Sequence, residues 1–536
     1  MARIAVLLTL VFAPLLAISQ GAPSDQTIRV STHLVQINII ARDKNGPVPN
    51  LTKDDFVVTD EHVTRPIGVF SVESAKFMHE PVQPLPPNTF SDLPQYGTSF
   101  PNSVTIVLLD NLNTLTGTAP VPYEETSPWL EDHALANAKA HLIEFIRGMD
   151  PGERVAIYSL RDSLRVRCDF TGDRNELLAI LEHYDASSKT ERETVNPAPI
   201  HTPVPGAFNS EVDRQRASLA ALANQNRAET TMAALQSIAA HVADIPGRKN
   251  LIWLTANLPF SAPAIAAVLN RAHIAVYPVD GRGLLPRNDM KSLREGVDAD
   301  ALGAARPALD PAPEPVGIGT MEKLAEETGG EAFVNTNDLT GAVRKAVEDS
   351  AITYTLGFYV DAGSLDGKFH KLKVQVERKG VNLRYPDGYF AIKDAPASVG
   401  QSQAALLSAI RSPLESSVIP VQVKVARVEQ PLPHSLLLSS SIDIHALRLT
   451  QSGDARTGAV DVVLLEQDKT GKVLHQSTSR INLRFREKQY EDCLKSGVQF
   501  GQDVQPRDGT TTLRIMVEDS GTAELGSLII PLAEIK

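Results

Sequence analysis

The spacing of hydrophobic and polar positions changes twice along the chain, and each change marks a different kind of structure. Residues 28–72 alternate between apolar and polar side chains, as strands do when they bury one face. Short apolar runs then alternate with stretches at helical spacing over residues 103–350. After Ala351 the period of two returns and continues, with one helical link, to the end. The order predicts strands, then an α/β block, then strands again.

The α/β block begins with an apolar, β-branched run at residues 103–110. A run that is apolar on both faces is typical of a strand covered on both sides, as in a parallel sheet. Further strands are expected at residues 155–160, 164–170, 250–255 and 274–279, and helices at 129–147, 173–183, 212–243, 263–271, 321–328 and 339–350. This alternation predicts a doubly wound, mostly parallel sheet, with residues 164–170 as an edge strand.

The strands on either side of this block are too few to bury a core separately. We therefore predict one small β-sandwich built from residues 25–76 and 351–393, with the α/β block inserted between them. Phe56 and Phe70 should then pack near Leu356, Phe358 or Val374.

The full predicted order also includes segments outside these two units. Arg3, an apolar core and small residues near Ala17 are typical of a secretory signal, and no later apolar run is long enough to span a membrane. We therefore expect an exported protein, periplasmic or secreted. The predicted segments are a signal peptide (1–21), β segment (25–76), proline-rich linker (77–101), α/β domain (102–350), β segment (351–393), linker helix (394–416) and C-terminal Ig-like β-sandwich (417–536).

Composition narrows the classes of function. The net charge of -12 comes without clusters of lysine and arginine, which argues against a nucleic-acid partner. Cys168 and Cys493 fall in different predicted domains, so we expect two separate thiols. The sequence contains no Gly-x-Ser-x-Gly or His-Glu-x-x-His motif, and we predict that the protein is not an enzyme. The oligomeric state stays open.

Polar residues follow the first apolar strand directly, in the loop Asp110-Asn111-Leu112-Asn113-Thr114. This loop resembles the Asp-x-Ser-x-Ser metal loop of von Willebrand factor A domains. The resemblance implies a divalent cation held by Asp110, Thr114 and a threonine of a middle helix, Thr230 or Thr231. Leu112 and Ala256 stand at two ligand positions and bring no oxygen, so we expect weak or no Mg²⁺ binding and no other cofactor. In the alternative reading, Asp110 and Asn113 only cap the following turn.

Motifs in four parts of the chain, taken in this order, resemble the VWFA-related Acidobacterial domain family. They are VPNLTKDDF (48–56), LDNLNT (109–114), PGRKNLIWL (246–254), and the group YTLGFY (354–359), GKFHKL (367–372) and GYFA (388–391). The family implies the fold and an exported bacterial setting, and domains of this type bind proteins through the rim near the metal loop.

The resemblance therefore predicts a protein-binding or adhesion module with a degenerate metal site and an unidentified protein ligand. The predicted binding rim consists of Asp110, Asn113, Thr114, Thr231 and Asn257. Two alternatives remain open: an envelope scaffold whose β-domains make the contacts, and a hydrolase of unfamiliar type.

Overall fold

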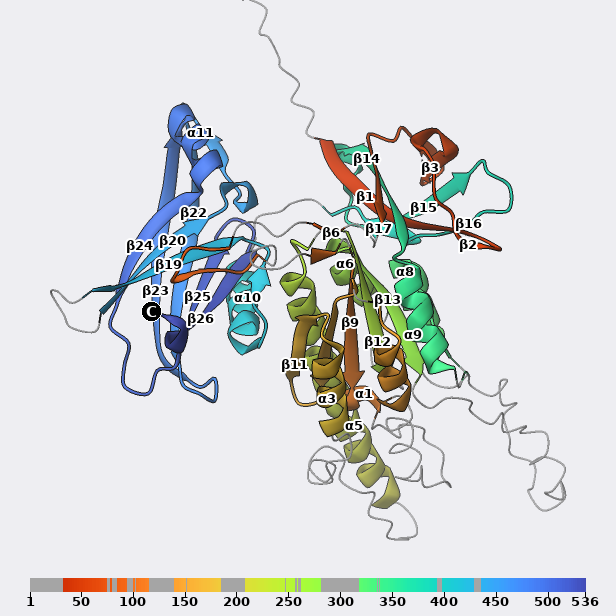
Figure 1. Cartoon of the computed structure of the whole chain (residues 1–536), viewed down its shortest axis with the longest axis horizontal. Helices are drawn as coiled ribbons and strands as arrows, with labels where there is room; N and C mark the ends of the chain where they lie inside the picture. Colours follow the sequence, from red (N-terminus) through yellow and green to blue (C-terminus); the bar gives the residue numbers. More distant parts are fainter. Residues whose placement is uncertain are drawn as a thin grey trace, which may run out of the picture.

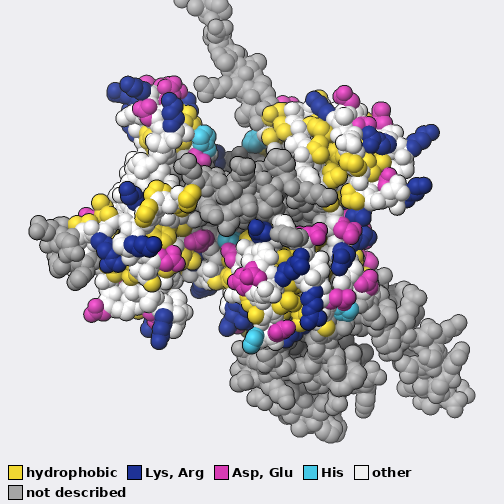
Figure 2. All heavy atoms as spheres, viewed as in Figure 1, with side chains coloured by type: hydrophobic (Ala, Val, Ile, Leu, Met, Phe, Trp, Pro, Cys, Tyr) yellow, Lys and Arg dark blue, Asp and Glu magenta, His cyan; other side chains and the backbone are white. Residues whose placement is uncertain are grey.

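The computed structural model has three parts, seen in Figure 1 as a small β-sandwich, an α/β domain beneath it and a C-terminal β-sandwich to the left. Charged side chains of both signs are scattered over the visible face of each part (Figure 2). In the described chain, no helix is long and apolar enough to cross a membrane. The structure describes residues 32–74, 78–79, 84–93, 100–101, 103–114, 139–150, 152–184, 208–245, 247–255, 258, 262–280, 318–334, 336, 338–392, 398–428 and 435–536.

The small sandwich combines strands from both sides of the α/β domain. One sheet has the order β16-β1-β14-β5, with β2 also paired to β1, and the other has the order β17-β15-β3-β4. β1 pairs antiparallel with β14 across more than 300 residues of sequence, and β3 pairs with β15 in the same way. The strands are β1 (Thr32–Asp43), β2 (Gly46–Pro47), β3 (Phe56–Asp60), β4 (Val63–Arg65), β5 (Val69–Ser74), β14 (Ile352–Asp361), β15 (Phe369–Val376), β16 (Asn382–Arg384) and β17 (Gly388–Phe390).

The core of this sandwich brings Phe70 next to Leu356, one of the contacts expected between the two sets of strands. Phe70 lies opposite Leu356 in the strand register, and the ring centroids of Phe56 and Phe70 are 6.2 Å apart. Tyr354 contacts both rings and donates its hydroxyl to the Val48 carbonyl at 2.7 Å. The amino-terminal strands therefore complete the core of the later ones, which explains why neither set would be stable alone.

The α/β domain contains one five-stranded sheet in the order β11-β10-β9-β12-β13. The strands are β9 (Ser103–Asp110), β10 (Val155–Leu160), β11 (Leu164–Thr171), β12 (Arg248–Thr255) and β13 (Ile274–Asp280). All neighbours are parallel except β11, which pairs antiparallel with β10 as the predicted edge strand. Numbered along the chain, this order is 3-2-1-4-5, which is typical of doubly wound α/β folds.

Helices cover both faces of this sheet. One face packs against α5 (Phe208–His241), α6 (Ala262–Arg271) and α8 (Ile318–Thr328). The other face packs against helical residues 139–147, α3 (Arg174–His183) and α9 (Leu339–Glu348). Asp173 caps α3 through its carboxylate, which accepts the Asn175 amide at 2.9 Å. The parts of the predicted first helix before residue 139 lie outside the described chain.

The C-terminal part is also a two-sheet β-sandwich. Its sheets have the orders β24-β20-β19-β7 and β18-β26-β25-β22-β21, with β23 added beside β22, and they enclose one core. Helix α10 (Val399–Arg411) packs on the outside of the second sheet. The later elements are β18 (Ser416–Ser417), β19 (Val421–Val428), β20 (Ser435–Ile442), β21 (Thr450–Ser452), β22 (Ala455–Gln467), β23 (Val473–Arg486), α11 (Glu487–Ser496), β24 (Val498–Val504), β25 (Thr512–Asp519) and β26 (Leu525–Pro531).

The segment expected to be only a proline-rich linker contributes to this second sandwich. β7 (Thr89–Ser91) pairs with β19 as an edge strand, and Phe90 packs against the C-terminal core. On either side of it, β6 (Met78–His79) and β8 (Phe100–Pro101) pair with each other. The interpretation of residues 77–101 as a linker is therefore wrong for β7. A short strand can join a sheet by pairing with one exposed edge, even where its own segment has no core. Helix α11 and β24 were also not predicted.

Candidate functional site

The candidate site lies at the carboxyl edge of the five-stranded sheet, where the strand order reverses. β9 has β10 on one side and β12 on the other, so the chain leaves the sheet in opposite directions at this point. Ligands of open α/β sheets bind in the crevice outside such a switch point. Asp110 is the last residue of β9, and the short helix α1 (Asn111–Thr114) begins directly after it.

Asp110 is fully buried, and its carboxylate accepts hydrogen bonds from three N–H groups. The Asn113 backbone amide donates to Oδ1 at 3.0 Å, and the Asn113 side-chain amide donates to Oδ2 at 2.8 Å. From the neighbouring strand, Trp253 donates its indole N–H to Oδ2 at 2.9 Å. Burial raises the pKa of Asp110 above its usual value, while these donors oppose the shift by stabilising the charged form.

Thr231 joins this network from α5. The second N–H of the Asn113 side-chain amide donates to its hydroxyl oxygen at 2.9 Å. Asn113 and Thr231 are both buried, at 2% and 0% exposure. One chain of hydrogen bonds therefore connects β9, α1, α5 and β12, and it fixes the start of the loop that follows Asp110.

Three of the five predicted rim residues come together in this network, but they do not form a surface. Asp110, Asn113 and Thr231 lie beneath the edge, and no partner reaches them without displacing other parts of the chain. The Thr114 side chain and all of Asn257 lie outside the described residues. Thr230, the other candidate threonine, is only half-buried. These buried positions form the floor of the carboxyl edge.

The described residues of the predicted metal loop do not fit a hard cation. Both oxygens of Asp110 already accept N–H donors, whose positive ends would repel a cation placed on the same lone pairs. Leu112 packs against the hydrophobic core and offers no oxygen. Among the described residues, His, Cys, Asp and Glu form no group of three or more that suits a metal. The bond from the Asn113 amide to Asp110 is instead the turn-capping contact of the alternative interpretation.

Trp253 and Tyr184 are the residues of this site that the sequence did not indicate. Trp253 lies in the centre of an apolar strand, where the sequence predicts only a buried core side chain. Tyr184 donates its hydroxyl to the side-chain oxygen of Asn111 at 3.0 Å, and the Arg167 guanidinium lies 5.4 Å from its ring centroid. A buried Trp or Tyr needs a partner for its polar atom, and this requirement is the signal that could have pointed to them.

Exposed charges lie beside these buried residues, on the turn from β10 to β11 together with the first residues of β11, a segment (161–167) that we call the β10–β11 turn. Asp162 and Arg165 are exposed and form an ion pair at 3.0 Å. Arg167 is also exposed, and it donates to the Ser159 hydroxyl at 2.8 Å. These three side chains are exposed charged groups on the described part of the carboxyl edge.

Comparisons with known proteins give a limited picture. No protein-family model matches the chain, and no curated protein matches it. Solved structures that resemble it include a von Willebrand factor type A protein from Catenulispora acidiphila, at 10% identity and a TM-score of 0.24, covering 65% of this chain and 80% of that one. An aerotolerance-related membrane protein from Bacteroides fragilis matches at 16% identity and a TM-score of 0.26, covering 46% of this chain and 98% of that one.

A third match is the pilus adhesin SpaC from Lactobacillus rhamnosus GG, at 9% identity and a TM-score of 0.24, covering 86% of this chain and 58% of that one. Similarities of this size do not establish a common function. The α/β assignment rests on the strand order described above, and the narrower Acidobacterial family stays a prediction.

Proposed function

We propose that the chain is an exported protein-binding module that contacts its partner through the carboxyl edge of the α/β domain and needs no metal ion for it. The observation that carries this proposal is the Asp110 network, in which N–H donors occupy both carboxylate oxygens and connect β9, α1, α5 and β12. A preorganised edge lowers the entropy that is lost when a partner binds.

The same geometry argues for binding over hydrolysis at this site. A catalytic group needs an accessible reacting atom and a neighbouring acid or base. Asp110, Asn113 and Thr231 are enclosed and hydrogen-bonded to one another. The exposed Asp162, Arg165 and Arg167 offer charge for recognition of a protein surface.

A second candidate, an envelope scaffold that contacts its neighbours through its β-domains, is favoured by the open edge of β23. This strand is 14 residues long and, within the described chain, pairs only with β22. A long unpaired edge is suited to the addition of another strand.

A pull-down from native envelope extract separates the two candidates. The immobilised full chain is compared with a double variant of the β10–β11 turn, Arg165→Glu with Arg167→Glu, and with the matched control Arg484→Glu on β23. The proposed function expects capture to be lost in the turn variant and kept in the control. Loss in the control alone would instead support the scaffold.

The metal-independence of the proposal is tested on the same protein. Capture should be equal with a chelator and with Mg²⁺, and Mg²⁺ should not raise the melting temperature of chelated protein. A tight cation site would stabilise the fold by about 3 kcal/mol at saturation. A shift of several degrees, or capture only with Mg²⁺, would overturn this part of the proposal.

A further inference from the structure

A cavity of about 140 Å³ lies between the small sandwich and the α/β domain. Its walls come from β1 and β17 on the sandwich side, and from α6, β13 and the start of β12 on the other side. It is therefore at the amino edge of the five-stranded sheet, far along the strands from Asp110. Ligand sites occur often at interfaces between domains.

The wall of the cavity is mostly apolar, but its charges all have the same sign. Among the described residues that line it, Arg248 and Arg271 are charged, and there is no aspartate or glutamate. The chain as a whole carries a net charge of -12. A cavity whose charged side chains are only basic, in an acidic protein, is complementary to an anion. The apolar part of the wall consists of Val35, Ile37, Ala267, Ile274, Leu372 and Phe390.

Arg248 is the group that points to a ligand. It is 2% exposed, and its Nε donates to the Asn250 side-chain oxygen at 3.2 Å. Its Nη2 donates to the Tyr277 hydroxyl at 3.1 Å and to the Gly329 carbonyl at 2.7 Å. For Nη1, the described part of the chain supplies no acceptor. Nη1 is not among the fully enclosed atoms that lack a partner, so its two N–H groups stay accessible to a ligand in the cavity that Arg248 lines.

Asn38 shows the same pattern on the sandwich side of the cavity. It is 8% exposed, and its side-chain oxygen accepts the Thr355 hydroxyl at 2.9 Å. Its side-chain NH₂ has no acceptor among the residues that the structure describes. Two fixed donors, one from each domain, therefore line a single cavity.

His273 adds polarity to the wall without a competing negative charge. Its backbone φ of 55° lies in the left-handed region, in the turn from α6 to β13, where glycine is the usual residue. Burial lowers the pKa of this imidazole to about 4, with a further contribution from the charge of Lys249. The ring is therefore neutral near pH 7 and can donate a hydrogen bond to an anion from one nitrogen.

We infer that this cavity binds a small organic carboxylate, with the carboxylate at Arg248 and Asn38 and an apolar body against Ile274, Leu372 and Phe390. An apolar protein cavity of about 150 Å³ holds benzene, so an apolar body of about that size fits. Arginine suits carboxylate because its planar N–H groups match the oxygens. Inorganic phosphate would leave the apolar walls unused.

Benzoate is the probe, measured by calorimetry on the full chain at constant ionic strength. A ligand of this size should bind with a dissociation constant of about 1 mM. Benzamide, which has the same shape without the charge, and phosphate, which has no apolar body, should each bind at least about tenfold more weakly. Absence of benzoate binding, or equal binding of phosphate, would overturn the inference.

Variants then assign the binding to the cavity. Ala267→Leu fills the space from α6 and should weaken benzoate binding at least about tenfold, whereas Ala264→Leu, at an exposed position of the same helix, should leave it unchanged. Asn38→Ala removes one donor and should weaken binding about fivefold. These variants leave the structural bonds of Arg248 in place. Equal affinity of Ala267→Leu and the unchanged chain would place benzoate elsewhere and overturn the inference.

Discussion

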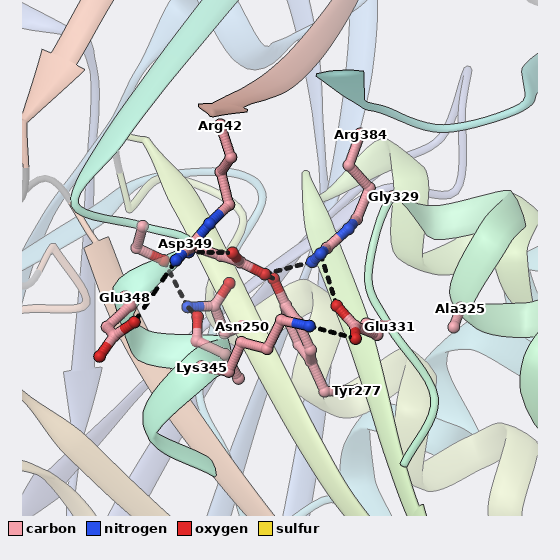
Figure 3. Close-up of polar contacts among 12 residues, drawn as sticks. Arg42, Asn250, Tyr277, Ala325, Gly329, Glu331, Lys345, Glu348, Asp349 and Arg384 are labelled. Carbon is pink, nitrogen blue, oxygen red and sulfur yellow. Dashed lines mark hydrogen bonds and ion pairs between the residues drawn. The ribbon is translucent and has the colours of Figure 1, made fainter. Parts of the chain in front are cut away.

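The α/β domain has a junction with each of the two sandwiches, and the two junctions handle charge in opposite ways. At the small sandwich, the Asp349 carboxylate is fully buried at the end of α9 between two arginines. Arg42 of β1 donates to it at 2.9 Å, Arg384 of β16 pairs with its other oxygen, and Tyr277 of β13 donates its hydroxyl to it at 3.0 Å (Figure 3). The negative charge of Asp349 is thus paired with one arginine from β1 and one from β16.

Two further carboxylates, Glu331 and Glu348, extend this first junction. Glu331 accepts from Arg384 and from Lys345, each at 2.5 Å, and Glu348 lies 3.5 Å from Arg42 (Figure 3). Each carboxylate of the group therefore faces at least one cation. Such a junction is held by paired charges, and removal of one partner leaves the other buried charge without compensation.

At the C-terminal sandwich, carboxylates outnumber the cations that face them. His241 at the end of α5 points Nδ1 at the Glu415 carbonyl, 3.0 Å away, and Nε2 at the Asp169 carboxylate, 3.2 Å away. Both partners are acceptors, so only a doubly protonated ring satisfies both. Burial alone would lower the pKa of His241, but the bond to Asp169 and its charge raise it above its usual value.

Three further carboxylates crowd this second junction. Asp92 accepts the Val421 amide at 3.0 Å, and burial together with the charges of Glu415 and Asp244 raises its pKa to about 8. Burial and the charge of Asp443 raise the pKa of Asp244 to about 6, and burial raises that of Glu415. The cations that face the group are Lys249 and Arg514, both themselves buried.

The α/β domain is thus joined to the small sandwich by carboxylates that are paired with cations. It is joined to the C-terminal sandwich by carboxylates and an imidazole that hold protons. The first junction should respond to removal of a charge, and the second to pH. The predictions below test this difference, starting with the largest expected effect.

Asp349→Ala should destabilise the protein most, because it leaves Arg42, Arg384 and Tyr277 without their shared acceptor. Removal of one partner from a buried pair costs about 3 kcal/mol or more. Urea unfolding measures the loss. The control is Glu348→Ala in the same junction, whose side chain is 52% exposed and should cost less than about 0.5 kcal/mol. Equal losses for the two variants would contradict the matched-charge description.

Raising the pH should weaken the second junction and spare the first. Asp92 keeps its proton in the folded chain up to about pH 8, whereas the unfolded chain loses it near its usual value, so folded protein binds more protons between these limits. Stability therefore falls as the pH rises through this window and levels off above about pH 8. His241 acts in the same direction, since its stabilising charge is lost as the pH rises through its raised pKa.

Asp92→Asn tests this source of pH dependence. Asparagine keeps an oxygen for the Val421 amide and has no proton to lose. Between about pH 6 and pH 9, the unchanged chain should lose about 2 kcal/mol more than the variant, which thermal unfolding at each pH would measure. An identical pH profile for both proteins would remove Asp92 from the explanation.

His241→Gln should have a smaller and pH-dependent effect. Glutamine makes one of the two hydrogen bonds but carries no charge, so the variant should lose about 1 kcal/mol near pH 6. The loss should shrink as the pH rises through the raised pKa of His241, because the unchanged ring then becomes neutral as well. A loss that stays constant with pH would show that shape, and not protonation, holds this contact.

The smallest effect is expected at the strand that the linker adds to the C-terminal sandwich. Asn88 exchanges two hydrogen bonds with the backbone of Lys536, at 2.9 and 2.7 Å, and its φ is 58°. Asn88→Gly keeps this left-handed backbone and removes both bonds, at a cost of about 0.5 kcal/mol because the site is exposed. Asn50→Gly, at a similar φ of 65°, is the control. A cost no larger than the control would mean that the tie to Lys536 adds nothing.

Local pattern was a good guide to strands and helices, and a poor one to the environment of each side chain. The alternation of the flanking segments predicted that β1 and β14 pair, since each set has one apolar face that needs a cover. The capping of α3 by Asp173 follows from a motif of a few residues. By contrast, β7 carries no local signal strong enough to predict its partner, because three residues fit many edges.

The sequence by itself determined that an apolar strand ends at Asp110 and that polar residues follow it at the carboxyl end of this strand. It also determined the loss of oxygens at Leu112, since ligand chemistry is a property of the residue. Only the tertiary structure decided that Asp110 is enclosed, because the indole of Trp253 arrives from a strand 143 residues away. Likewise, only the docking of the two domains left Arg248 with unused donors at a cavity. Burial depends on which distant surfaces meet, and one-dimensional periodicity carries little of that information.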